Sequence, residues 1–133
     1  TCDNVIITTP DRVYDFAITG EGAESSFTLD GEAVNRDKFK QVYQHLISPV
    51  GDEIFREDGD YEPYISVTFN YRKEYHDVYG TASDTIEFFK SDDRKNIVSV
   101  NGNVLFKVRQ VYTERLLENI DALLNGGEIR LDW

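Results

Sequence analysis

The sequence contains few of the residues that form disulfides, metal sites and nucleophilic active sites. It has no methionine, two histidines, three prolines and a single cysteine, Cys2, among 133 residues. One cysteine excludes an intramolecular disulfide. A chain of this length buries roughly two-thirds of the surface that its unfolded form exposes, so we expect it to fold without a disulfide or a metal ion.

Positive charge is also scarce. The chain has 14 lysine and arginine residues against 25 aspartate and glutamate residues, which gives a formal net charge of −11 at pH 7. Such a chain repels a phosphate backbone and an anionic membrane surface, so nucleic acid is excluded as a partner. No apolar run reaches the roughly 18 residues that span a bilayer. We therefore expect this chain to be a piece of a longer protein, which is anchored in a membrane only through a segment upstream of Thr1.

Motifs of catalysis are absent as well. The sequence has no glycine-rich phosphate loop, no nucleophile elbow, no paired cysteines and no histidine-rich metal motif. Cys2 lies near a chain end that we expect to be frayed, with no base placed beside it. His45 is expected to face water because it lies off the apolar stripe of its helix, and His76 lies in a polar connection. The sequence therefore predicts a protein that is not an enzyme and that uses no cofactor.

The composition that remains is that of one folded domain. Hydrophobic residues make up 40% of the chain and aromatic residues 13%, which is enough for a core. In the first half, strands are expected at residues 5–9, 13–18, 26–29 and 32–34. Asp30-Gly31 predicts a type I′ hairpin turn between the last two of these strands. A helix follows, with Asn35 or Asp37 as its N-cap and Pro49 at its end.

The second half contains the same kinds of element. Strands are expected at residues 64–71, 85–89, 97–100, 104–108 and 129–131. Asn101-Gly102 predicts a second hairpin turn, and Gly126 is placed to cap the end of a second helix. Strands and helices that follow one another in this way indicate the α+β class.

The two halves match each other in the order of their elements. This order predicts two tandem units in a single compact domain, each a small antiparallel sheet of hairpins followed by one packed helix. The units would be residues 1–49 and 63–133, joined by an acidic linker at 50–62. The alternative is that an α+β chain rich in hairpins produces such a match by coincidence.

The acidic linker contains the best candidate for a metal site. Asp58, Asp60 and Glu62 alternate with other residues, as the oxygen ligands of a calcium ion do. An EF-hand loop counted from Asp58 requires glycine at its sixth position and glutamate at its twelfth, where this sequence has Pro63 and Phe69. A solvated linker therefore explains these carboxylates better than a metal site does.

Five tyrosines around the second half's first strand form another candidate site. They are Tyr61, Tyr64, Tyr71, Tyr75 and Tyr79. A tyrosine offers a flat apolar face and a polar tip, so a cluster on one rim suits a peptide, a glycan or a protein partner. The alternative is that these side chains only pack at the edge of the sheet.

The pattern of strands, turns and helices resembles a bacterial family, domain of unknown function 4340. The resemblance is carried by residues 85–126, with the sequences IEFF, VSVNG and VLFKV before the last helix, and by FTLDGEAV at residues 27–34. It implies the extracytoplasmic part of a membrane-anchored protein, built from repeated α+β units and often associated with ABC transporters. The family has no assigned catalytic residues, so none is carried over.

Together these observations predict a non-enzymatic, extracytoplasmic interaction domain of a membrane-anchored envelope protein at the cell surface. Its expected partner is another protein, such as a component of a membrane transporter. The alternative is a module that binds a small ligand, a glycan or a peptide, with or without calcium. In that case the ligand would bind at the tyrosines and the acidic residues described above.

Overall fold

One nine-stranded sheet runs through the structure, a computed structural model that describes residues 2–20, 22–49 and 51–132. All neighbouring strands are antiparallel. In spatial order the strands are β4 (Glu32–Ala33), β3 (Ser26–Leu29), β2 (Val13–Thr19), β1 (Cys2–Thr8), β6 (Pro63–Tyr71), β7 (Ser83–Lys90), β8 (Lys95–Val100), β9 (Asn103–Arg109) and β5 (Glu53–Ile54).

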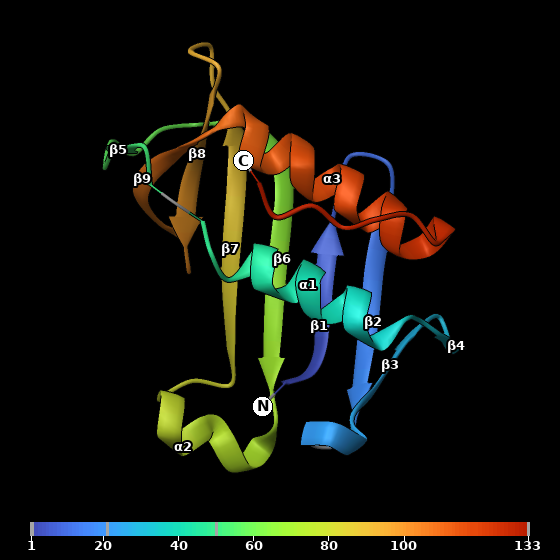
Figure 1. Cartoon of the computed structure of the whole chain (residues 1–133). Helices are drawn as coiled ribbons and strands as arrows, with labels where there is room; N and C mark the ends of the chain where they lie inside the picture. The colour runs from blue at the N-terminus through green and yellow to red at the C-terminus, as the bar shows by residue number, and fades with distance from the viewer. Residues whose placement is uncertain (1, 21, 50, 133) are drawn as a thin grey trace.

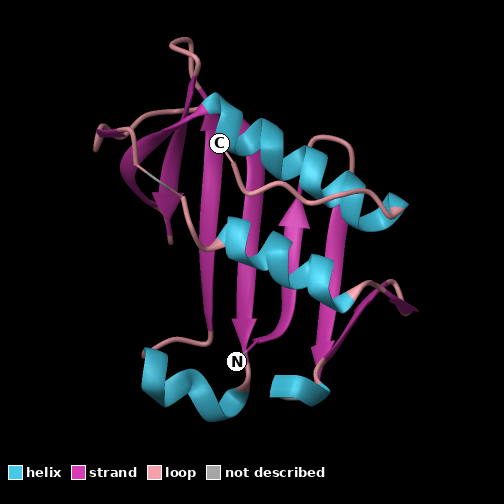
Figure 2. Ribbon diagram, in the orientation of Figure 1, coloured by secondary structure: helices cyan, strands magenta, loops and turns pink. Residues whose placement is uncertain are grey.

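Two long helices, α1 (Arg36–Leu46) and α3 (Gln110–Asn125), lie side by side across one face of this sheet (Figure 1). Three short helical segments, η1 (Gly22–Glu24), η2 (Lys73–Tyr75) and α2 (His76–Tyr79), lie at one end of the sheet (Figure 2). This arrangement confirms the α+β class. None of the helices in the described ranges is long and apolar enough to cross a membrane.

The small sheets that we expected for the two halves are joined into one. β1 is the neighbour of β6, and their register places Val5 opposite Phe69 and Ile7 opposite Val67. All four side chains are buried in the core that the helices cover. The first and second halves of the chain therefore share one hydrophobic core.

The predicted turns and caps are confirmed. Asp30 and Asn101 have φ angles of 52° and 51°, and the glycine after each has a φ of 85°. Positive φ at both central positions is the geometry of a type I′ turn, which Asp-Gly and Asn-Gly favour. Asn35 caps α1 by accepting a hydrogen bond of 2.9 Å from the backbone N–H of Lys38, and Gly126 ends α3 with a φ of 74°.

Two segments differ from the expectation. Within the described chain no strand forms at 129–131, because the backbone of Arg130 bonds to a side chain instead of a strand. Its N–H donates to Oδ1 of Asn119 at 2.9 Å, and its carbonyl accepts from Nδ2 of Asn119 at 2.8 Å. The polar connection after β6 contains η2 and α2. In the acidic linker, where we expected at most a short strand at residues 54–55, the two residues of β5 pair with β9.

His45 is buried, so the expectation that it faces water is wrong. It is 0% exposed because α1 packs against both the sheet and α3, which covers two sides of the helix. Its Nε2–H donates to the carbonyl of Tyr112 at 3.0 Å, and its Nδ1 accepts from Nδ2 of Asn119 at 2.9 Å. The Tyr112 hydroxyl donates to the carbonyl of His45. Burial lowers the pKa of His45 to about 4, so the ring is neutral at pH 7.

We expect the buried His45 to make the protein less stable in acid. The unfolded chain binds a proton at this ring with a pKa of 6.5, whereas the folded protein binds it with a pKa of about 4. Between these values the unfolded state carries more protons, so stability falls as the pH falls. The free energy of unfolding should decrease on the order of 2–3 kcal/mol through this group alone. Chemical denaturation at several pH values measures the slope.

The variant His45→Gln should lose this part of the pH dependence. His76→Gln replaces the other histidine of the chain and is the control. It should keep this part of the pH dependence, because it leaves the buried His45 in place. Identical pH slopes for the wild type and His45→Gln would contradict the prediction.

Candidate functional site

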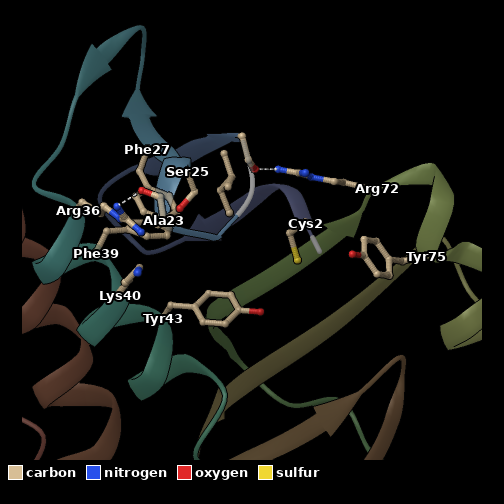
Figure 3. Close-up of a pocket in the computed structure, with 12 residues that line it drawn as sticks. Cys2, Ala23, Ser25, Phe27, Arg36, Phe39, Lys40, Tyr43, Arg72 and Tyr75 are labelled. Carbon is tan, nitrogen blue, oxygen red and sulfur yellow. Dashed lines mark hydrogen bonds between the residues drawn. The ribbon is translucent and has the colours of Figure 1, made fainter.

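A cavity of about 710 Å³ opens between α1 and one end of the sheet (Figure 3). Its size is that of a pocket for a small organic ligand. The walls come from α1, from the connection between β2 and β3, from the start of β1 and from the segment after β6. We call it the basic cavity, and the side chains that line it include Cys2, Ile18, Phe27, Arg36, Phe39, Lys40, Tyr43, Arg72 and Tyr75.

Three cations line the basic cavity in a protein of opposite net charge. They are Arg36, Lys40 and Arg72. Among the described residues that line the cavity, none is an aspartate or a glutamate, although the chain carries a net charge of −11. Cations gathered in a concave site create a positive potential that attracts anions.

The two arginines hold the connection between β2 and β3. Arg36, the first residue of α1, donates a hydrogen bond from Nη1 to the carbonyl of Ala23. Arg72, directly after β6, donates from Nη2 to the carbonyl of Gly20, and its Nε lies 3.9 Å from Oδ1 of Asp3. These bonds fix both guanidinium groups at the wall of the cavity.

Lys40 lies one helical turn after Arg36 on the same side of α1 (Figure 3). It is exposed, and within the described part of the chain it makes no hydrogen bond or ion pair. Its ammonium group is therefore available to a ligand in the basic cavity.

A thiol and two phenols lie between these cations. In Figure 3 the side chains of Cys2, Tyr43 and Tyr75 point toward one another from β1, α1 and η2. Cys2 is 3% exposed and pairs with Tyr71 of β6. The expectation that Cys2 lies at a frayed chain end is therefore wrong. Burial, and after it the adjacent Cys2, raise the pKa of Tyr43 to about 12. The Tyr43 hydroxyl therefore stays protonated and is able to donate a hydrogen bond.

The structure gathers three of the five predicted tyrosines beside this cavity. The ring centroids of Tyr71 and Tyr79 lie 4.7 Å apart, and those of Tyr75 and Tyr79 lie 6.0 Å apart. Tyr64 lies at the opposite end of β6, and Tyr61 precedes the start of that strand. The five tyrosines thus form two separate groups, of which one adjoins the basic cavity.

The other two tyrosines make contacts within the protein. The ring centroid of Tyr61 lies 6.1 Å from those of Phe55 and Phe89. The Nζ atom of Lys90 lies 5.6 Å from the ring centroid of Tyr64. These contacts connect the acidic linker and the start of β6 to the end of β7.

Asp58, Asp60 and Glu62 are exposed on the acidic linker. Glu62 lies 3.6 Å from Nζ of Lys90. The described residues contain no cluster of three or more histidine, cysteine, aspartate or glutamate side chains that could hold a metal ion. The three predicted carboxylates are therefore not brought together as a set of ligands.

Sequence reasoning did not identify the cations of the basic cavity. Arg36 and Lys40 carry a usable signal, because Arg36, Lys38 and Lys40 place three of the chain's 14 cations at the start of one helix. Arg72 carries none, because only the pairing of β6 with β1 brings it to the cavity wall.

We expect Gly20→Ala to disturb this wall. Gly20 has a φ of 77°, and a Cβ atom there would lie 2.5 Å from the backbone oxygen of Glu24. Gly80 is the matched control, since it has a φ of 72° but no atom within 4 Å of such a Cβ. Gly80→Ala should cost about 1 kcal/mol of stability through its left-handed backbone alone, and Gly20→Ala should cost more because the backbone must also move. Equal losses in urea denaturation would contradict this expectation.

Comparisons with known proteins assign no family to this chain. No family model, no curated protein and no solved structure matches it. The resemblance to domain of unknown function 4340 therefore stays a prediction from motifs, and the functional argument rests on the geometry and charge of the basic cavity.

Proposed function

We propose that this chain is a non-enzymatic binding module that holds a small organic anion in the basic cavity. The observation that carries the proposal is the charge of the cavity. Arg36, Lys40 and Arg72 line it, and none of the lining residues that the structure describes is acidic, in a chain of net charge −11. The two arginines also anchor the connection between β2 and β3, but Lys40 makes no bond within the described chain that would explain its position.

An anion gains more between these cations than at an open surface. Arg36 and Arg72 are half-buried, so salt screens them less than it screens exposed charges. A hydrogen bond to a charged group contributes about 1.5–3 kcal/mol. Carboxylate, sulfonate and phosphate groups match the planar fork of a guanidinium.

The composition of the cavity favours binding over catalysis. Among the described residues that line it, there is no histidine and no carboxylate to act as a general base. Cys2 lies beside the Tyr43 hydroxyl, which holds its proton at neutral pH. The cavity therefore offers groups that bind an anion and few that would transform one.

We also propose that the chain is built from two related units, residues 1–49 and 63–133. The order of elements supports this, because β1 to β4 and α1 have counterparts in β6 to β9 and α3. The two sets of strands extend in opposite directions from the central pair of β1 and β6. In each set, two residues of positive φ form the turn between the third and fourth strands.

A second candidate function is a protein-interaction domain of a membrane-anchored, extracytoplasmic envelope protein, as the resemblance implies. One observation favours an interaction surface: on α2, Val78 is 73% exposed and Tyr79 is 46% exposed. Neighbouring exposed apolar side chains are typical of contacts with other proteins. The partner in this proposal is a component of a membrane transporter.

The single cysteine of the chain lines the basic cavity and is 3% exposed, so a thiol reagent reaches it only when the cavity opens. We expect a bound anion to slow the reaction of Cys2 with a thiol reagent and to raise the melting temperature. Citrate, glucuronate, benzoate and 1-naphthoate form a suitable panel. Lys40→Glu should weaken the binding of any active anion about ten-fold or more, because it replaces an attraction by a repulsion.

Lys90→Glu makes the same change of charge at the far end of the sheet and is the control for this experiment. It should leave binding unchanged. Failure of every anion to slow the labelling of Cys2 would count against the proposed function, as would equal weakening by the two variants.

For the second candidate, Val78→Asp should abolish co-purification of transporter components from detergent-solubilised membranes without changing the melting temperature. Val13→Asp is the control, because Val13 is also exposed but lies on β2. Undiminished co-purification with the Val78→Asp variant would exclude α2 from such an interface.

A further inference from the structure

We infer that the anion of the basic cavity is amphipathic, with a flat apolar body on the floor of the cavity and one anionic group at its mouth beside Lys40. This inference rests on the proposed function and adds the class of ligand. That class is an aromatic or alicyclic ring system that carries a carboxylate or sulfonate.

The floor of the cavity is apolar and buried. Phe27 is 7% exposed and Phe39 is 1% exposed, and their rings stack with centroids 4.4 Å apart. Ile18 of β2 and Cys2 of β1 extend this floor. Phe27 and Phe39 are covered by the protein, so the apolar surface open to a ligand comes from the half-buried side chains of Ile18, Tyr43 and Tyr75. An apolar ring that covers these side chains displaces water from them favourably.

The charged groups lie in a separate layer. Along α1, Phe39 is buried and Tyr43 half-buried, one turn apart, whereas Arg36 is half-buried and Lys40 exposed, also one turn apart (Figure 3). The helix therefore presents an aromatic stripe and a cationic stripe to the same cavity. A ligand that contacts both stripes has an apolar part and an anionic part next to each other.

The cations on the two sides of the mouth are not equivalent. Arg72 donates to the carbonyl of Gly20 and lies 3.9 Å from the carboxylate of Asp3, which balances part of its charge. Lys40 has no ion pair among the residues that the structure describes. The anionic group therefore binds at Lys40.

Two dyes with the same ring system separate the contribution of charge from that of the apolar body. 8-Anilino-1-naphthalenesulfonate carries a sulfonate, and N-phenyl-1-naphthylamine is the same scaffold without it. In fluorescence titrations of the folded protein, we expect the sulfonate to bind saturably, one molecule per chain, with a Kd at least ten-fold lower than that of the neutral compound. Lys40→Gln should remove this difference and leave the Kd of the neutral compound unchanged.

Two further variants complete the experiment. Ile18→Ser, on the floor, should weaken the binding of both dyes, and Lys90→Gln, far from the cavity, should affect neither. Equal affinities for the two dyes in the wild type, or tight binding of the sulfonate by Lys40→Gln, would overturn the inference.

The two proposals fail in different ways. Binding of citrate or glucuronate that depends on Lys40, without binding of the naphthalene sulfonate, would overturn the amphipathic ligand and leave the proposed function intact. If no anion binds at the basic cavity, both proposals are overturned.

Discussion

The antiparallel pairing of β1 with β6 is the contact on which the rest of the structure depends. It joins strands from opposite halves of the chain in the middle of the sheet, so both halves contribute side chains to one core. The same pairing sets Cys2 opposite Tyr71 and brings the next residue, Arg72, to the wall of the basic cavity. A register shift of one residue would turn Val5 and Ile7 away from the core. The fold and the cavity therefore depend on the same backbone hydrogen bonds.

One side of the helix α1 packs against α3, and another side lines the basic cavity. On the side of α3, His45 is held by hydrogen bonds to Tyr112 and Asn119. Asn119 also bonds the backbone of Arg130, so the network ties the C-terminal segment to the helix pair. A buried polar network stabilises a structure only while each member has its partner, which restricts how the helices can shift. This network therefore holds α1 in position, and with it the cationic and aromatic side chains that line the basic cavity.

Structural features that a few adjacent residues determine could be predicted from the sequence. Features that depend on residues far apart in the chain could not. The turn at Asp30-Gly31 formed as predicted because its backbone geometry is set by its own two residues. His45 was placed wrongly because the apolar stripe of a helix shows only its side toward the sheet, and α3 covers another side. Tyr75 was identified as a candidate, but its cavity was not, because Arg72 and α1 meet there only after folding.

The edges of the sheet influence how separate molecules behave toward one another. Both outermost strands, β4 and β5, are two residues long, and each contains an exposed glutamate, Glu32 and Glu53. A long unpaired edge is a template on which another chain adds a strand, and short charged edges remove that template. Two molecules that approach edge to edge also repel each other through their net charge of −11. The sheet thus ends on both sides in a way that opposes aggregation and the growth of cross-β fibrils.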